Sequence, residues 1–587
     1  MIIEKIEELL EQSALKVGVS EKFSVAFSKM PQLCDFQSNN CFALSKKYGK
    51  NPLELAENIV KNIEKSDFFQ FSVAKPAFIN VKLTDKCLSY LGNEFLKNDM
   101  AGVGKHEKKQ KIVLDYGGAN VAKALHVGHL RPAIIGESLK RLYRFMGDEV
   151  ISDVHLGDWG LQMGLTELQL FEEGKVDGYF KGEGNKTITI EMLNEAYPKA
   201  SARKKVEEDF RKKAEEWTVK IQNKEQPYYS IYQEIRRVSV ENIEKNYNKL
   251  GAQFDLWYGE SNASEYTDEV IDIIKSKGLA RISEGALIVD VAKEGENIPL
   301  PKKKDDEVQR YNNPMPPCII QKENGAVLYA TTDIATIYMR NKMFEDVDRI
   351  EYVTDQRQQL HFTQVFRVSK MAGFSPENQQ LLHIGHGTMN GYDGKPFKTR
   401  SGDTFKLEDI IDLLIEKASA KLASNNVEID TERALKIGVS AMKFGDLINT
   451  VGKDYVFDLD KFLSFEGKTG PYLQYTVCRI NSILNKLGAQ EKEGEFIVFN
   501  EEDREIIKAI IKLNSSYEIC YQEKSLNTLC SALYDLASAF SAFYNNHNVA
   551  KEEDKVKKAS YVALLKLVKA KLLQGLDILA IEIPDKM

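Results

Sequence analysis

Residues 111–131 read KIVLDYGGANVAKALHVGHLR, and this stretch decides the fold. Ile112, Val113 and Leu114 form the short apolar run of a buried parallel strand, and glycines follow where that strand must stop. Apolar residues then recur at helical spacing over 130–146, with Gly147 just past the end. A second strand is expected over 150–154. The order strand, helix, strand predicts a βαβ unit, which binds ligands at the carboxyl ends of its strands.

Two histidines lie in the loop of this unit, before the helix begins. His126 and His129 flank Gly128, which lets a ligand approach the backbone. Two imidazoles near a helix N-terminus can donate hydrogen bonds to a polyphosphate. On these four residues alone, a metal half-site and a solvated loop are open alternatives.

The same stretch, together with Gly157-Asp-Trp-Gly-Leu-Gln162, resembles the HIGH signature region of class I arginyl-tRNA synthetases. The resemblance covers nearly the whole chain. It implies a Rossmann-type parallel sheet of the class I synthetases (class α/β), a small N-terminal α/β domain and a C-terminal all-α helical bundle. Its other anchors are Asp35-Phe-Gln-Ser-Asn39, Leu328-Tyr-Ala-Thr-Thr-Asp333, Arg357-Gln-Gln-Leu-His361, Lys398-Thr-Arg-Ser-Gly402, Gly467-Lys-Thr-Gly-Pro-Tyr-Leu-Gln-Tyr475 and Gly575-Leu-Asp-Ile-Leu-Ala-Ile-Glu-Ile-Pro584.

A chain of 587 residues exceeds what one hydrophobic core organises, so several domains are expected. Residues 1–105 are predicted to form the N-terminal domain, which by resemblance contacts tRNA. Residues 106–405 are predicted to form the catalytic domain, with long charged helices marking a connecting insertion at about 165–325. Residues 406–587 are mainly helical in pattern. The family uses this part to read the anticodon.

In the second half of the catalytic domain, apolar runs predict buried strands at 326–329 and 350–353 around a helix at 333–344. His383 and His386 form a second His-x-x-His, which we interpret as strand-end structure near the nucleotide, because no long apolar-faced helix begins there. Further along, helical spacing predicts helices at 407–422, 430–446, 471–488, 501–523, 526–546 and 554–579.

The composition is that of a soluble globular protein, with 43% hydrophobic and 28% charged residues. No apolar run is long enough to span a membrane, and the N-terminus lacks a signal-peptide core, so a cytoplasmic location without membrane contact is expected. The seven cysteines include no Cys-x-x-Cys pair, which argues against a structural zinc site or other protein-bound metal. With a net charge of −7, any RNA contact must use local basic patches. A monomer is expected.

The resemblance implies two-step chemistry with ATP, Mg²⁺ and arginine. The arginine carboxylate attacks the α-phosphorus, pyrophosphate leaves, and the terminal adenosine of the tRNA for arginine accepts the acyl group. His126, Gly128 and His129 are expected to bind ATP, with the two histidines as catalytic hydrogen-bond donors to the phosphoryl transition state.

A cationic loop is expected to complete the ATP site. The family consensus is Lys-Met-Ser-Lys-Ser, and here the loop reads Phe397-Lys-Thr-Arg-Ser-Gly402, with Arg400 in place of the second lysine. Lys398, Arg400 and Ser401 are expected to contact ATP, and Arg400 is also a candidate catalytic residue. Because the usual lysines are absent, Lys123 is expected to supply a catalytic charge; the alternative is a solvated lysine.

A guanidinium is best held by carboxylates and a flat or hydroxylated face. Asp115 and Asp333, with Tyr329, are therefore the candidate ligands of the arginine side chain, and Asn120 and Gln358 of its α-amino and carboxylate groups. An aspartate at a strand end or helix start is otherwise often a cap.

Candidate tRNA contacts are Gln37, Asn39 and Phe78 in the N-terminal domain and Tyr472 and Tyr475 in the helical part. Two other functions are compatible with parts of the sequence. One is a nucleotidyl transferase or a class I synthetase for another amino acid, which the paired aspartates disfavour. The other is an inactive tRNA-binding paralogue, which the intact histidines disfavour.

Overall fold

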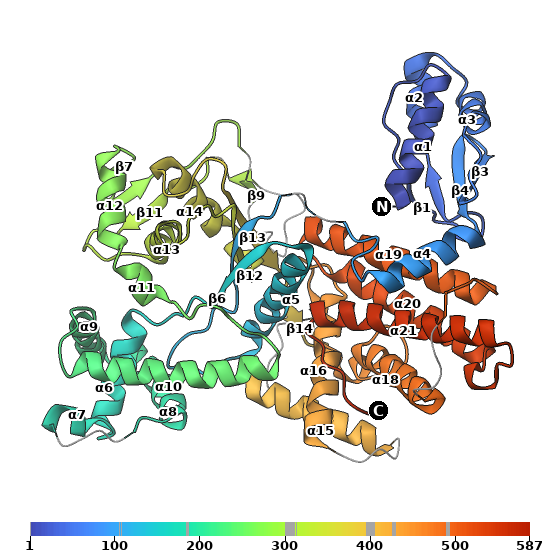
Figure 1. Cartoon of the computed structure of the whole chain (residues 1–587). Helices are drawn as coiled ribbons and strands as arrows, with labels where there is room; N and C mark the ends of the chain where they lie inside the picture. The colour runs from blue at the N-terminus through green and yellow to red at the C-terminus, as the bar shows by residue number, and fades with distance from the viewer. Residues whose placement is uncertain are drawn as a thin grey trace.

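The computed structural model describes residues 2–587 except 105, 107, 183–186, 297, 300–310, 313, 395–404, 425–429 and 489–493. Its centre is a four-stranded parallel sheet of β5 (Lys111–Asp115), β6 (Glu149–Asp153), β12 (Arg349–Asp355) and β13 (Gln380–His386). Helix α5 (Leu130–Met146) joins β5 to β6, so the predicted βαβ unit is confirmed (Figure 1).

The strand order is β13-β12-β5-β6, so each half of the sheet grows outward from the central pair β5 and β12. Their register sets Tyr352 opposite Asp115, so the two strands end side by side. In open parallel sheets, ligands bind where the strand order reverses. The loop after β5 and the loop after β12 therefore face the same crevice.

The strand expected at 326–329 is wrong. Val327 makes only an isolated bridge to Gln321 and is 43% exposed, and Tyr329 already begins helix α13 (Tyr329–Met343). The strand that precedes α13 is instead β11 (Cys318–Gln321), which pairs antiparallel with strand β8 (Ala286–Val289) of the insertion. The strand at 350–353 is confirmed within β12, which α14 (Gln359–Ala372) connects to β13.

The insertion between the halves contains a helical part and a small sheet. Helix α10 (Tyr228–Lys249) runs beneath the central sheet in Figure 1, beside the helices α6, α8 and α9. The sheet has the order β11-β8-β7. The remaining elements are α6 (Leu161–Glu172), α7 (Asp177–Lys181), α8 (Ile190–Val206), α9 (Glu208–Gln222), α11 (Glu260–Ser264), α12 (Thr267–Ser276), β7 (Ala280–Ser283), β8 (Ala286–Val289), β9 (Ile298–Pro299) and β10 (Tyr311–Asn312).

The N-terminal part is a four-stranded antiparallel sheet with helices, as the α/β pattern predicts. The strand order is β1-β2-β4-β3. One face, which includes Phe36, Ile79 and Val81, is buried against helices. The elements are α1 (Ile2–Lys16), β1 (Ala26–Phe27), β2 (Phe36–Ser38), α2 (Cys41–Tyr48), α3 (Pro52–Lys61), β3 (Phe69–Ala74), β4 (Phe78–Leu83) and α4 (Asp85–Lys97).

The C-terminal part is the predicted helical bundle, and each of the six expected helices is present. Strand β14 (Met389–Asn390) pairs with β15 (Tyr455–Val456) and ties the bundle to the catalytic part. The helices are α15 (Leu407–Ser424), α16 (Thr431–Leu447), α17 (Leu459–Phe462), α18 (Gly470–Leu487), α19 (Glu501–Glu523), α20 (Asn527–Asn546) and α21 (Lys555–Ile578).

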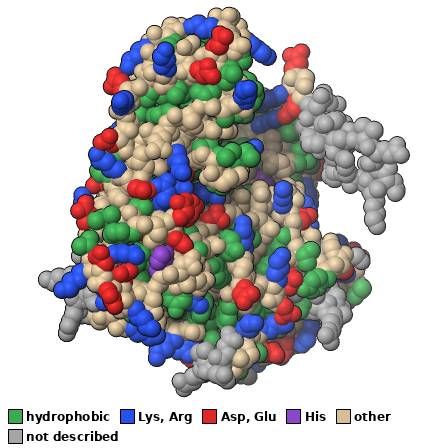
Figure 2. Space-filling model, turned by 90° about the vertical axis from the view of Figure 1, so that its right-hand side faces the viewer, with side chains coloured by type: hydrophobic (Ala, Val, Ile, Leu, Met, Phe, Trp, Pro, Cys, Tyr) green, Lys and Arg blue, Asp and Glu red, His purple; other side chains and the backbone are tan. Residues whose placement is uncertain are grey.

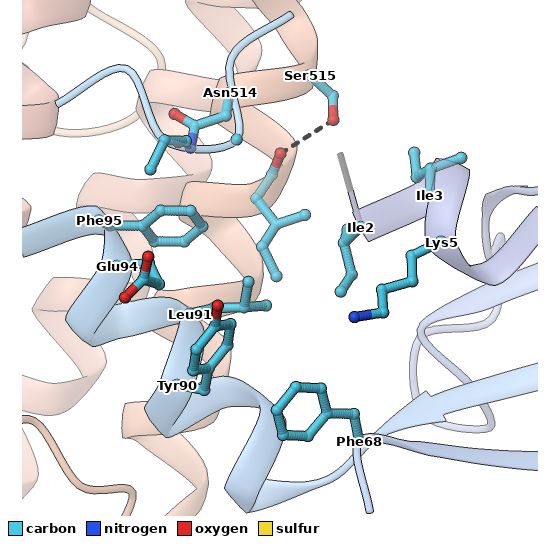
Figure 3. A pocket seen from close by; sticks show the side chains of 13 residues that line it. Ile2, Ile3, Lys5, Phe68, Tyr90, Leu91, Glu94, Phe95, Asn514 and Ser515 are labelled. Carbon is cyan, nitrogen blue, oxygen red and sulfur yellow. Dashed lines mark hydrogen bonds between the residues drawn. The ribbon is translucent and has the colours of Figure 1, made fainter. Parts of the chain in front are cut away.

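The N-terminal domain sits on this bundle through α4 (Figure 1). Asn514 of α19 and Lys571 of α21 bond to the carbonyl oxygens of Ala101 and Asp99, which follow α4. Between the two parts lies a cavity of about 240 Å³, with Phe95 on one wall (Figure 3). Its lining comes from both termini of the chain and includes no strand of the catalytic sheet.

Charged side chains of both signs are interspersed on the face shown in Figure 2, in keeping with the net charge of −7. An RNA bound here must therefore use local groups of basic side chains. Among the helices of the described residues, none has the length and apolar content needed to cross a membrane.

Candidate functional site

His126 and His129 form a closed turn at the entrance to α5. The backbone N–H of Gly128 donates to Nδ1 of His126 at 3.1 Å, and the backbone N–H of His126 donates to Nδ1 of His129 at 3.1 Å. The two ring centroids are 4.0 Å apart. A Cβ on Gly128 would lie 2.9 Å from the His126 ring, so the turn requires glycine there.

Both imidazoles are neutral at physiological pH. Burial, with a smaller contribution from the charge of Lys123, lowers the pKa of His126 to about 4. Burial first, then His126 and Lys123, lower the pKa of His129 well below its usual value. Because Nδ1 of each ring accepts a hydrogen bond, the single proton of each neutral ring is on Nε2. The turn thus presents two uncharged N–H donors.

These donors open into a crevice of about 450 Å³ at the carboxyl ends of β5 and β12. The crevice is lined on one side by the loop after β5, which includes Gly117, Gly118 and Asn120. On the other side it is lined by the loop after β12, including Gln358. The site therefore occupies the place where the strand order reverses, as expected for a nucleotide.

The second His-x-x-His lies at the end of β13, where we interpreted it as strand-end structure. His383 has both ring nitrogens bonded, to Thr354 at 2.8 Å and to Gln359 at 2.9 Å. His386 lies within 2.9 Å of the carbonyl oxygen of Gly387 and lines the crevice. These rings brace the loop after β12.

Asp115 lines the crevice, but its carboxylate already has a guanidinium partner. Nη2 of Arg340 lies 2.6 Å from Asp115 and 2.7 Å from Asp153. All three side chains are buried. With one guanidinium between two buried carboxylates, burial prevails at Asp115 and raises the pKa of its carboxyl. Direct contact between Asp115 and a substrate guanidinium would require the pair with Arg340 to open.

Asp333 and Tyr329 lie in the first turns of α13. Oδ2 of Asp333 is 2.5 Å from Nε2 of His361, while Tyr329 is 69% exposed. A third residue joins them that the sequence did not suggest, Glu260 at the start of α11. Burial first, then Asp333, raise the pKa of Glu260 to about 8. Glu260 in turn helps to raise the pKa of Tyr329, so these three side chains from two parts of the chain lie within electrostatic reach of one another.

The loop after β5 makes a close backbone contact with the segment that precedes α6. Asn120 and Gly157 form a parallel bridge, and a Cβ on Gly157 would lie 2.4 Å from Oδ1 of Asn120. Asp158 follows directly, and its charge also contributes to the raised pKa of Glu260. Asn120, which lines the crevice, is therefore linked through Gly157 to the segment that carries Asp158.

Comparison with known proteins covers the whole chain. Residues 93–459 match the family described as "tRNA synthetases class I (R), catalytic domain". An "Arginine--tRNA ligase" of Agathobacter rectalis is 40% identical over 100% of both chains. One of Alkaliphilus oremlandii is 39% identical, again over 100% of both. The chain belongs to the class I arginyl-tRNA synthetases. The arginyl-tRNA synthetase of Plasmodium falciparum has the same fold, with a TM-score of 0.80 at 24% identity, covering 100% of this chain and 99% of that one.

The flanking parts of this arginyl-tRNA synthetase match family descriptions of their own. Residues 1–83 match the "Arginyl tRNA synthetase N terminal domain". Residues 473–587 match the "DALR anticodon binding domain". The helices of the bundle from α18 onward therefore form an anticodon-binding domain.

Two of the candidate tRNA contacts of the N-terminal domain, Gln37 and Phe78, share one face of its sheet. Gln37 pairs with Asn80 in the register of β2 and β4, and Nε2 of Gln37 donates to Oδ1 of Asn80 at 2.9 Å. Because side chains alternate along strands, Phe78 lies on the same side as Gln37 and Asn80, and Asn39 directly follows β2. That side is opposite the buried face that includes Ile79.

In the anticodon-binding domain, Tyr472 and Tyr475 lie in the first turns of α18. Tyr472 is 2.9 Å from Oγ of Ser541. The guanidinium of Arg479 lies 4.6 Å from the ring centre of Tyr475 and 4.7 Å from that of Tyr544. Such an alternation of aromatic rings and a guanidinium is typical of surfaces that stack nucleic-acid bases.

The cationic side of the ATP site is described only in part. Lys123 lies within electrostatic reach of both histidines. The predicted positions Lys398, Arg400 and Ser401 lie outside the described residues. Arg357 lines the crevice and pairs with Asp355, 2.6 Å away.

Among the described residues, one group has the spacing of metal ligands, namely Asp115, Asp153 and His155, whose ligand atoms lie within 4.8 Å of one another. Arg340 already provides the cation for the two carboxylates. The carboxylates that line the crevice, Asp115 and Asp355, are both paired with guanidinium groups. These residues do not fit a Mg²⁺ held by the protein, so Mg²⁺ would arrive with the phosphates of ATP.

Proposed function

We propose that the crevice activates arginine with ATP and that the synthetase then transfers arginine to the terminal adenosine of its tRNA. The observation that carries this proposal is the pair of neutral imidazoles, His126 and His129, in the lining of the crevice at the carboxyl ends of β5 and β12. The proposal adds Asp333 and Glu260, which lie within electrostatic reach of each other, as the carboxyl groups for the guanidinium. The reaction requires hydrogen-bond donors for the phosphates and carboxylates that accept from the arginine guanidinium. Asp333 and Glu260 are the proposed carboxylates and are called the acid pair below.

The histidine turn handles the phosphates. In this proposal, Nε2 of His126 and Nε2 of His129 donate to oxygens that gain charge as the α-phosphorus is attacked. Nδ1 of each ring already accepts a backbone hydrogen bond and Nε2 carries the proton, so neither ring has a free nitrogen for a substrate proton. The reaction needs no base because the arginine carboxylate is already ionised. Gly128 lets the nucleotide approach the turn. Lys123 adds positive charge beside it.

The acid pair handles the arginine side chain. Asp333 and Glu260 accept from the forked guanidinium, and Tyr329 covers its flat face. Glu260 must be ionised for this role, and a bound cation drives that ionisation because opposite charge lowers a carboxyl pKa. Asn120 and Gln358 hold the α-amino and carboxylate groups. Asp115 does not contact the substrate in this proposal; its ion pair with Arg340 fixes that side chain at the end of the sheet.

The activation step balances without a protein intermediate. A bond forms between a carboxylate oxygen of arginine and the α-phosphorus, the bond to the bridging oxygen of the β-phosphate breaks, and pyrophosphate leaves. The protein contributes position and electrostatic stabilisation.

In this proposal the tRNA spans the molecule. Gln37, Asn39 and Phe78 meet one part of it, and Tyr472 and Tyr475 meet the anticodon end. Lys398, Arg400 and Ser401 are proposed to close over ATP, and we expect a cytoplasmic monomer without a structural zinc.

ATP–pyrophosphate exchange tests the proposal. The assay is run with each amino acid in turn, with and without tRNA, on the full chain. Exchange with arginine alone among them is expected. Exchange with another amino acid instead, or none with arginine when tRNA is present, would overturn the assignment.

A further inference from the structure

A second hollow lies in the insertion, behind the acid pair. It measures about 810 Å³ and is lined by the α10 side chains Tyr229, Arg236 and Arg237 and by Trp159 and Trp257 from the neighbouring loops. Its charged lining consists of three basic and two acidic side chains. It is therefore an aromatic hollow with basic side chains at its edge.

The aromatic rings of this hollow are organised as a group. Tyr229 and Tyr232 are stacked with ring centroids 5.6 Å apart, and Trp159 meets Tyr232 edge-on at 5.4 Å. Tyr232 is buried, while Tyr229 and Trp159 are partly exposed. Rigid rings that reach a hollow offer π-faces to a flat partner, and base–ring stacking tolerates any base.

Two of the basic side chains have exposed partners that a phosphate could replace. Lys224 pairs with Glu265 at 3.2 Å, and both side chains are more than half exposed. Arg237 pairs with the exposed Glu241 at 2.6 Å and is also held by Glu234 at 2.7 Å. Exposed ion pairs contribute little to stability, so a phosphate could replace Glu265 or Glu241 at small cost while Glu234 keeps Arg237 in place. Arg236 is committed to Asp158 at 2.7 Å.

The hollow shares a wall with the arginine end of the active site. Asp158 binds Arg236 and Ser261 on the hollow side, with Ser261 Oγ at 2.8 Å. On the other side it is close enough to raise the pKa of Glu260. Trp159 stands two residues after Gly157, which bridges to Asn120. Asn120 lines the crevice and Trp159 lines the hollow, so the two are linked through residues 157–159.

We propose that this hollow binds an unpaired nucleotide of the tRNA 3′ end, just before the terminal adenosine, by stacking its base on Tyr229. Arg237 and Lys224 would meet the phosphates. The proposal rests on the tRNA ligase activity proposed above and names where the acceptor strand lies.

The test compares two RNAs, the full tRNA transcript and the same transcript without its three unpaired 3′ nucleotides. Affinities of the wild type, Tyr229→Ala, Tyr229→Phe and Val219→Ala are measured at one salt concentration. We expect Tyr229→Ala to weaken the full transcript about 5- to 100-fold and leave the truncated one unchanged. Tyr229→Phe should match the wild type, as should Val219→Ala, an exposed control on α9.

Equal weakening of both RNAs would show a structural effect, and no weakening of either would show that the base lies elsewhere; both results overturn the proposal. Arg237→Gln is an independent variant on an exposed side chain. It should reduce the salt slope for the full transcript by about one and not for the truncated one. Equal slopes for both RNAs contradict the phosphate contact. Wild-type exchange with arginine, measured in parallel, separates failure of this proposal from failure of the ligase assignment.

Discussion

Replacing Asp333 by asparagine should weaken arginine far more than ATP. The change keeps the shape of the side chain but removes the charge that the proposal places against the guanidinium. A hydrogen bond to a charged group contributes about 1.5–3 kcal/mol. Since 1.4 kcal/mol is tenfold, the arginine concentration for half-maximal exchange should rise about 10- to 100-fold.

Two features of the structure limit the loss of arginine affinity in this variant. The Asp333 side chain is 22% exposed, so solvent screens part of the lost charge, and Glu260 still faces the ligand. The contact with His361 is also partly exposed, and the asparagine oxygen can still accept from that ring. The fold should therefore survive. The concentration of ATP for half-maximal exchange should not move.

The assay is ATP–pyrophosphate exchange at saturating tRNA, with arginine and ATP varied separately and thermal unfolding measured beside it. His361→Asn serves as a matched variant, since it alters the same hydrogen bond without removing the carboxylate. An unchanged arginine dependence in a folded Asp333→Asn protein would place the guanidinium elsewhere. A parallel rise for ATP would mean that Asp333 shapes the crevice as a whole.

Three further predictions concern the same site. His126→Ala and His129→Ala should each lower exchange about 100- to 1,000-fold and leave tRNA affinity unchanged, because each removes one N–H donor; equal loss in both assays would indicate misfolding. Lys123→Ala should lower exchange more than Lys398→Ala, because its charge reaches both imidazoles, and the opposite ranking would refute this. Because Glu260, with a pKa of about 8, is protonated below that pH, half-maximal arginine should fall as pH rises from 7 to 9. Glu260→Gln should flatten this change, and a pH dependence that persists would assign it to another group.

The histidine turn and α5 were predictable because their signals are local. The apolar spacing gave both ends of α5, and Gly147 after it takes the left-handed conformation, with φ 105°. Gly128 could be assigned to a close approach for the same reason. In the structure the nearest neighbour is the His126 ring itself, so this glycine shapes the turn as well as the path of a ligand.

The partners of the site residues were not predictable, because they come from distant segments. Arg340 meets Asp115 across 225 residues, and nothing near either position indicates the pair. Glu260 lies in the insertion at a helix start, where an acid usually means only a favourable helix dipole. The false strand at 326–329 has a related cause. A run of three apolar residues has the same pattern in a strand as in the segment before a helix. The sequence does not show that β11 is the strand that pairs with the insertion here.

The boundary predicted at residue 405 divides the catalytic part from the C-terminal helices in the sequence. In the fold the two parts are packed together at α5. The outer side of that helix is covered by the anticodon-binding part: Arg141 binds Asp577 at 2.8 Å, and the ring of Tyr143 lies 5.1 Å from that of Tyr521. At its other end, Arg131 binds Asp446 at 2.9 Å in a buried pair, two residues after His129. The helix that follows the histidine turn is thus held by the anticodon-binding part at Arg141 and Tyr143. At its start it is held by Asp446, which belongs to the segment that matches the catalytic domain. Any shift of that bundle on tRNA binding must be absorbed at α5 or transmitted through it, because packed interiors do not deform freely.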